Sequence, residues 1–130
     1  MFNFKSVKQA LLALSILAGT SAIPAYAKQP EQGIVNVSYY AHYFHGRTQA
    51  NGKPFNMHAM TAAHKSLPLG TRVKITNVNS NKSVIVTVTD RGPYIKGRVF
   101  DLSYGAFKQI APISQGVARV KYTILKWRMI

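Results

Sequence analysis

Residues 84–93 read Val-Ile-Val-Thr-Val-Thr-Asp-Arg-Gly-Pro, and the alternation in this stretch indicates a β protein. Val84, Val86 and Val88 share one face of an extended chain, while the residues between them share the other face, which is the period of two typical of a strand. The Gly-Pro pair that follows is a turn signal. We therefore predict a strand over 84–89 that ends at Asp90.

Other segments repeat this pattern. Residues 34–40, 71–78 and 118–125 are further strand candidates. One short helix is predicted after Ser103, a suitable N-cap, and Pro112 ends it. Several short strands with one short helix favour a small barrel.

The polar stretch from His42 to Met60 contains Gly46, Asn51-Gly52 and Pro54, so its composition predicts a long loop. Loops of this length inside a compact domain are uncommon and are often functional.

The N-terminus has the order of a secretory signal peptide. Lys5 and Lys8 precede an apolar run over 10–19, and residues 25–27 read Ala-Tyr-Ala, which suits a signal peptidase. The apolar run is shorter than the roughly 20 residues of a membrane-spanning helix. We expect a signal peptide over 1–27, cleavage after Ala27, and a periplasmic or secreted protein.

Cleavage there leaves 103 of the 130 residues, which is the size of one small domain. We assign residues 28–36 to an N-terminal lead and 37–127 to the domain. The chain has no cysteine, so we expect no disulfide and no lipid anchor. We also expect a monomer.

The charge is strongly positive, with 17 Lys and Arg against 3 Asp and Glu and a formal net charge of +14. Such a field favours polyanionic partners. An exported protein rarely meets nucleic acid, so we expect no nucleic-acid partner and favour anionic envelope polymers. The alternative, that the lysines maintain solubility and protect sheet edges, is equally compatible with the charge.

The three acids limit the acid–base chemistry that the chain can perform. Glycan hydrolysis usually needs two carboxyl groups, and Glu31 lies in the lead. Asp90 is either a catalytic group at a strand end or a turn-forming residue. Asp101 precedes the predicted helix, where a carboxylate complements the helix dipole. Arg91 either binds a carboxylate or anion or is a solvated charge.

The four histidines lie in or near the long loop. His42 and His45 have a spacing that suits a metal, but the ligand set is incomplete, so we predict no metal site. His64 either bonds sugar hydroxyls or tunes a carboxylate, or is a satisfied buried residue.

A series of short motifs resembles the RlpA-like proteins in content and order, from about Val37 to Leu125. They are Ser38-Tyr39-Tyr40, Phe44-His45-Gly46-Arg47-Thr48, Ala50-Asn51-Gly52, Thr61-Ala62-Ala63-His64, Leu67-Pro68-Leu69-Gly70-Thr71, Asp90-Arg91-Gly92-Pro93, Gly97-Arg98 and Asp101-Leu102-Ser103.

The resemblance implies a mainly β fold, a six-stranded double-psi β-barrel with one or two short helices, shared with expansins. It implies an endolytic lytic transglycosylase, a lyase without a cofactor, that acts on peptidoglycan strands lacking stem peptides and forms 1,6-anhydromuramyl ends. Asp90 would protonate the glycosidic oxygen and then take the proton of the 6-hydroxyl, and His64 would orient the substrate or support Asp90. The substrate-binding residues would be Asp101, Arg91, Tyr40, His45, Arg47 and Asn51.

The chain departs from the family pattern at Lys53, where an acid usually follows Ala-Asn-Gly. A lysine there would stabilise ionised Asp90 and oppose its action as a proton donor. The alternative function is therefore a non-catalytic, expansin-like module that binds glycan or loosens the wall.

Overall fold

The structure is a computed structural model that describes residues 30–126. The predicted signal peptide over 1–27, its cleavage site and residue 127 lie outside the described residues. Within the described part, no helix is long and apolar enough to cross a bilayer.

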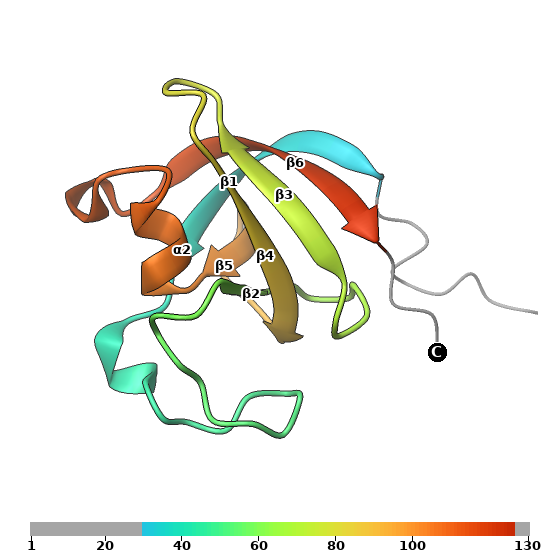
Figure 1. Ribbon diagram of the computed structural model, residues 1–130, viewed down its shortest axis with the longest axis vertical. Helices are drawn as coiled ribbons and strands as arrows, with labels where there is room; N and C mark the ends of the chain where they lie inside the picture. The colour runs from blue at the N-terminus through green and yellow to red at the C-terminus, as the bar shows by residue number, and fades with distance from the viewer. Residues whose placement is uncertain (1–29, 127–130) are drawn as a thin grey trace, which may run out of the picture.

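Six strands close into a barrel in the order β1-β5-β2-β4-β3-β6 (Figure 1). The strands are β1 (Gln32–Tyr39), β2 (Thr61–Ala63), β3 (Arg72–Asn77), β4 (Ser83–Asp90), β5 (Arg98–Leu102) and β6 (Ala118–Lys126). The β1/β5 and β2/β4 pairs are parallel, and the other neighbours are antiparallel. One short helix, α2 (Tyr104–Lys108), and 3-10 turns at His42–Phe44 and Ile113–Gln115 complete the fold. The predicted six-stranded, mainly β barrel is confirmed.

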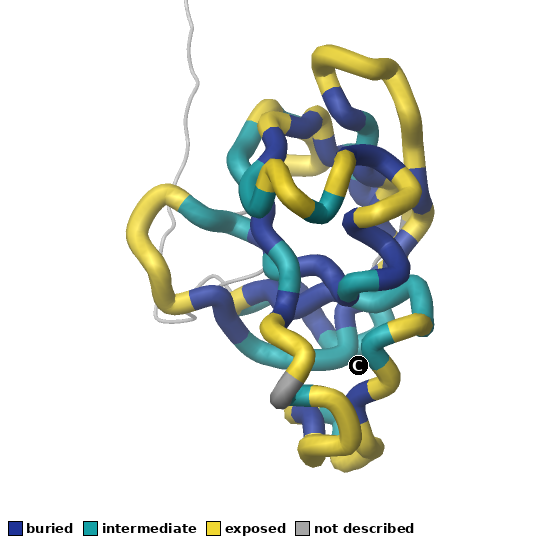
Figure 2. Tube along the Cα trace, turned by 90° about the vertical axis from the view of Figure 1, so that its left-hand side faces the viewer, coloured by how far each residue is buried: buried dark blue, intermediate teal, exposed yellow. Residues whose placement is uncertain are grey.

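The barrel interior is the apolar core. Val84, Val86 and Val88 of β4 are buried, while Ile85 between them is 41% exposed, as the alternation predicts. Phe107 of α2 is fully buried and packs into the same cluster. Figure 2 shows the buried segments gathered inside and the exposed ones on the turns.

The first strand is shifted relative to the predicted 34–40, because β1 runs from Gln32 to Tyr39 and includes residues 32–36 of the expected lead. These residues pair with β6 in the register Gln32↔Thr123 to Val37↔Ala118. Backbone pairing thus makes a strand of residues whose side chains are mostly polar or exposed.

The helix begins as predicted, since the Ser103 hydroxyl accepts from the Ala106 N–H at 3.0 Å. Asp101, however, belongs to β5 and not to the first helical turn. Its carboxylate accepts a hydrogen bond from the Ser38 hydroxyl at 3.0 Å. Asp101 precedes the N-cap by two residues, as predicted, and its interaction with the helix dipole stays a prediction.

The long loop over 42–60 has a defined structure below the barrel (Figure 1). Gly46 N donates to Phe55 O at 2.8 Å and Phe55 N donates to Arg47 O at 2.7 Å, which folds the loop back on itself. Gly105 of α2 fixes its far end, because Gly105 N donates to Met57 O at 2.8 Å. The loop therefore forms one wall of the space at this end of the barrel.

Candidate functional site

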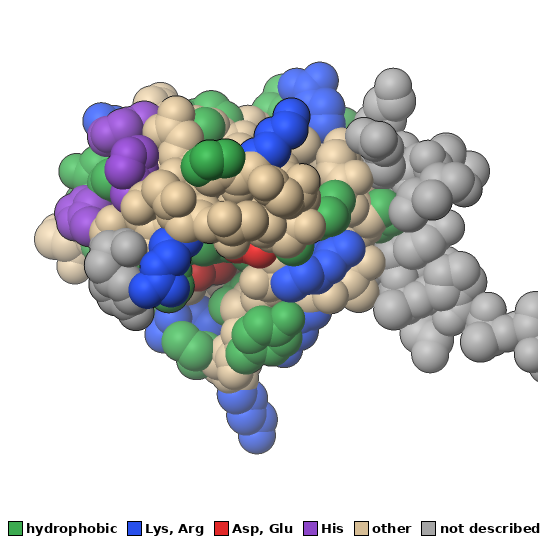
Figure 3. Space-filling view, turned by 90° about the horizontal axis from the view of Figure 1, so that it is seen from below, with side chains coloured by type: hydrophobic (Ala, Val, Ile, Leu, Met, Phe, Trp, Pro, Cys, Tyr) green, Lys and Arg blue, Asp and Glu red, His purple; other side chains and the backbone are tan. Residues whose placement is uncertain are grey.

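A cavity of about 520 Å³ lies between the long loop and the segment that follows β4. Its acids are Asp90 and Asp101, and its cations are Arg47 and Arg91. In the space-filling view from this end, the acidic atoms lie in a hollow with Lys and Arg side chains on both sides (Figure 3). The cavity is therefore polar at its centre and basic at its rim.

Strand register explains why the two aspartates meet. Ala63 of β2 pairs with Asp90 of β4 on one side and with Asp101 of β5 on the other. Neighbouring strands lie about 4.8 Å apart, so the two aspartate Cα atoms are roughly 10 Å from each other. All three residues line the cavity. Two residues eleven positions apart in sequence thus supply a pair of carboxyl groups to one space.

The Asp90 carboxylate is held by three donors. Tyr40 Oη donates to Oδ2 at 2.7 Å, while the backbone N–H groups of Ala50 and Arg91 donate to Oδ1 at 2.8 and 2.9 Å. Gly92 then turns the chain away with φ at 123°, a conformation that favours glycine. The arrangement fixes the orientation of the Asp90 carboxylate within the cavity.

Tyr40 is itself held in place by aromatic neighbours. Its ring stacks on Phe55 with centroids 4.5 Å apart and meets Phe44 edge-on at 5.7 Å. Burial, and then the hydrogen bond to Asp90, raise the pKa of the Tyr40 hydroxyl, which stays a proton donor. Tyr40 is thus a positioning residue for Asp90.

The second carboxyl group of the cavity, Asp101, has a raised proton affinity. Burial raises the pKa of Asp101 to about 6, and the charge of Asp90 acts in the same direction, whereas Ser38 and Arg98 oppose the shift. A carboxyl group that keeps its proton up to this pH is able to donate it.

His64, predicted as a catalytic residue, does not line this cavity. Its buried ring packs on Phe100 with centroids 4.9 Å apart, and its Nδ1 accepts from the N–H groups of Ser66 and Leu67, both at 3.0 Å. Burial lowers the pKa of His64 to about 4, helped by the charges of Arg91 and Lys65. The link to Asp90 runs through the backbone, where His64 N donates to Asp90 O at 3.1 Å.

The predicted substrate-binding residues fall into two groups. Those that line the cavity are Asp101, Arg91, Tyr40 and Arg47.

His45 and Asn51 are outside the cavity lining. His45 Nδ1 accepts from Met57 N at 3.1 Å, so this ring braces the loop. Asn51 lies at a neighbouring cavity, and its Oδ1 accepts from Lys53 N at 2.9 Å.

Sequence reasoning missed the apolar wall of the site. Phe44, Phe55 and Tyr94 line the cavity, and Tyr94 is 78% exposed at the rim. Aromatic rings with a free face suit the apolar faces of sugar rings. The position of two of these residues next to recognised motifs could have identified them. Tyr94 directly follows Gly92-Pro93, and Phe44 begins a family motif.

Histidine side chains gather on one side of the face seen in Figure 3, away from the acids. The His42 and His58 rings both lie near Tyr104, with centroids 5.1 and 6.4 Å from its ring. The His45 and His58 ring centroids are 6.0 Å apart. Within residues 30–126, no group of three or more His, Cys, Asp or Glu side chains is arranged to hold a metal ion.

Comparisons with known proteins agree with this architecture. The sequence profile of the lytic transglycolase family matches residues 35–122. A probable endolytic peptidoglycan transglycosylase RlpA of a Synechocystis species is 52% identical over 89 residues, which are 68% of this chain and 28% of that protein. The endolytic peptidoglycan transglycosylase RlpA of Campylobacter jejuni is 47% identical over 88 residues, covering 68% of this chain and 32% of the relative. The chain thus spans about a third or less of these relatives.

A solved structure supports the fold independently of sequence. An expansin variant of Clavibacter michiganensis, in complex with cellohexaose, has a TM-score of 0.58 at 17% identity, covering 73% of this chain and 50% of that one. The barrel is accordingly of the double-psi type that the motifs implied. The match over residues 35–122 and the two relatives show that the chain belongs to the lytic transglycolase family, as an RlpA-like member.

Proposed function

We propose that this protein is an endolytic peptidoglycan transglycosylase, a lyase. One observation carries the proposal: this chain, a member of the family, has two carboxyl groups in one cavity. They belong to Asp90 and Asp101, and each has its own hydrogen-bonding environment. The two relatives carry this activity in their names. Strands without stem peptides are the proposed substrate, and 1,6-anhydromuramyl ends are the proposed product.

The geometry favours a division of the two proton transfers. Asp101 donates its proton to the glycosidic oxygen as the bond from that oxygen to C1 of muramic acid breaks. The 6-hydroxyl oxygen of the same sugar forms a bond to C1, and its proton passes to Asp90. No water is added, and exchange with solvent restores both carboxyl groups. The sequence assigned both transfers to Asp90, and the raised pKa of Asp101 supports the sharing.

The surrounding residues have positioning roles in this proposal. Tyr40 fixes the Asp90 carboxylate at 2.7 Å. Tyr94 offers an exposed ring to the sugars, and Arg47 supplies a cation at the rim. His64 supports Asp90 through its backbone N–H.

The second candidate is a non-catalytic module that binds glycan. It is favoured by Lys53 in place of the usual acid and by the structural likeness to an expansin bound to a glucose oligomer. This alternative predicts retention on glycan strands with no new chain ends.

Product analysis separates the two. Purified glycan strands stripped of stem peptides are incubated with wild type and with Asp90→Asn, and new ends are identified by mass spectrometry. Anhydro ends from wild type, and far fewer from Asp90→Asn, are expected. Folded wild-type protein that binds strands and forms no such ends would exclude the enzyme, and equal ends from the variant would exclude Asp90.

We also propose an anionic envelope polymer as a second partner. Arg72 and Lys74 on β3, with Arg119 and Lys121 on β6, are exposed on neighbouring strands of the barrel exterior. Because the six described strands form a closed barrel, these cations protect no sheet edge, which weakens the alternative explanation of the charge. A double charge reversal at Lys74 and Lys121 is expected to weaken retention on lipopolysaccharide at low salt; unchanged retention would contradict this partner.

Export, cleavage after Ala27, a monomeric state and the absence of a nucleic-acid partner remain predictions.

A further inference from the structure

A second cavity, of about 600 Å³, lies beside the candidate active site. Arg91 lines both cavities. The second one also contains Asn51 and Lys53, and none of the three acids of the chain lines it. The first cavity balances two cations with two acids, whereas the second presents positive charge without a counter-charge.

Arg91 supplies a fixed cation at the boundary between the two cavities. Its Nη1 donates to the backbone carbonyls of Leu67 at 2.6 Å and His64 at 3.1 Å. These bonds orient the guanidinium, and among residues 30–126 no carboxylate pairs with its charge. Because backbone carbonyls hold the group, its position does not depend on a mobile side chain.

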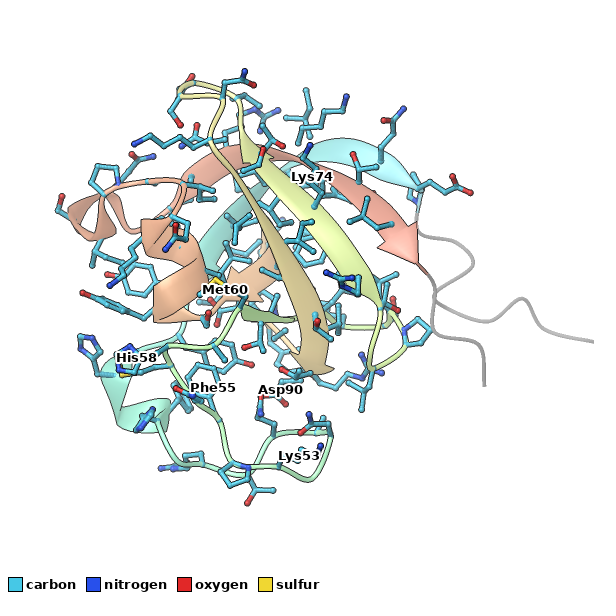
Figure 4. The ribbon with its side chains drawn as sticks, in the orientation of Figure 1. Lys53, Phe55, His58, Met60, Lys74 and Asp90 are labelled. Carbon is cyan, nitrogen blue, oxygen red and sulfur yellow. The ribbon has the colours of Figure 1, made fainter. Side chains whose placement is uncertain are left out.

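Lys53 lies on the same loop that binds Asp90. Ala50 N donates to the Asp90 carboxylate at 2.8 Å, and three residues later Lys53 closes the turn by accepting from Gln49 N at 2.9 Å. Lys53 N is held in turn by Asn51 Oδ1. Figure 4 shows Lys53 on this loop below Asp90. The base of the Lys53 side chain is therefore anchored next to the catalytic centre.

We propose that the second cavity is a subsite for the lactyl carboxylate of a muramic acid residue whose stem peptide has been removed. The inference rests on the proposed function and deepens it. In a stripped strand each lactyl group ends in a free carboxylate, whereas in an intact strand the same carbon forms a neutral amide bond to the peptide. Lys53 and Arg91 bind the free carboxylate of a stripped strand by charge-assisted hydrogen bonds. They make no comparable interaction with the neutral amide of an intact strand. Lys53, where the family usually has an acid, then adds a contact that distinguishes stripped strands from intact ones.

The test measures binding separately from turnover. In an Asp90→Asn background, affinity is measured for stripped strands and for the same strands after their lactyl carboxyls have been converted to primary amides. Conversion is expected to weaken binding about fivefold, which is the effect of losing one well-placed ion pair. Lys53→Gln should weaken binding to the carboxylate strands by a similar factor, leave the amide strands unaffected, and thus remove the difference. Lys53→Arg should restore it.

Lys82→Gln is the matched control, since Lys82 is also exposed but lies in the turn between β3 and β4, outside the lining of both cavities and outside the proposed polymer-binding surface. It removes the same charge and should leave the discrimination between the two strands intact. The subsite is refuted if amidation leaves affinity unchanged, if Lys53→Gln weakens both strands equally, or if Lys82→Gln has the same effect as Lys53→Gln. Wild-type protein that forms no anhydro ends while the carboxylate discrimination holds would refute the enzyme and not the subsite.

Discussion

The pKa of Asp101 is raised and the pKa of His64 is lowered, so acidification changes the free energy of unfolding in opposite directions through the two residues. The pKa of Asp101 is raised to about 6, so the folded protein holds a proton that the unfolded chain releases. This stabilisation is complete below about pH 4 and is lost as the pH rises through 6. The pKa of His64 is lowered to about 4. Its stabilisation is present above about pH 6.5 and is lost as the pH falls through 4.

In wild type, the changes in the free energy of unfolding from Asp101 and His64 nearly cancel. On going from about pH 7.5 to about pH 4.5, linkage gives a gain of about 2 kcal/mol from Asp101 and a loss of about 2.5 kcal/mol from His64. The pair together therefore changes the free energy of unfolding by about 0.5 kcal/mol. Removing either member exposes the effect of the other.

Asp101→Asn keeps the size of the side chain and an acceptor for the Ser38 hydroxyl. We expect this variant to lose about 2 kcal/mol more than wild type on acidification, measured by urea unfolding at both pH values. His64→Gln should show the reverse, a relative gain of about 2.5 kcal/mol. Every other titrating group is shared by the three proteins and drops out of the comparison. If Asp101→Asn and wild type lose the same stability, Asp101 does not hold a proton near pH 6, and its role as proton donor fails.

Three further predictions concern the site and its loop. Tyr40→Phe removes a hydrogen bond to a charged group, so kcat for anhydro-end formation should fall about tenfold while the fold is kept; an unchanged kcat would contradict the positioning role. Lys53→Glu restores an acid at the family position, so it should raise kcat on stripped strands while weakening their binding in the second cavity, and a kcat equal to wild type would count against an inhibitory Lys53. Gly105→Ala places a Cβ 2.6 Å from the His58 carbonyl oxygen and should destabilise the protein by about 2 kcal/mol in urea unfolding; a wild-type midpoint would mean that the loop is not held against α2.

The strands that sequence predicted are those with a long alternating pattern. In β4, three valines face the core and the residues between face outward, so the period of two is visible without any tertiary information. The short strands β2 and β5 have three and five residues, which is too few for a pattern to stand out. They become strands because neighbours in the closed barrel satisfy their backbone groups.

The candidate site was predicted residue by residue, but its assembly was not. Asp90 was selected as a strand-ending acid, and the structure places it in the cavity. Its meeting with Asp101 depends on Ala63 pairing with both, which only the topology specifies. For His64 the motif predicted a catalytic role, but the structure buries its ring outside the cavity. Its burial and its hydrogen bonds to Ser66 and Leu67 depend on the tertiary fold and could not be predicted from the sequence.

The central claim is that the carboxyl pair breaks a glycosidic bond without water. Its most direct test is a digestion of stripped glycan strands in isotopically labelled water, with the new ends analysed by mass spectrometry. We predict anhydromuramyl ends that are lighter than hydrolytic ends by one water and carry no label. Reducing ends that carry the label would show hydrolysis and contradict the claim.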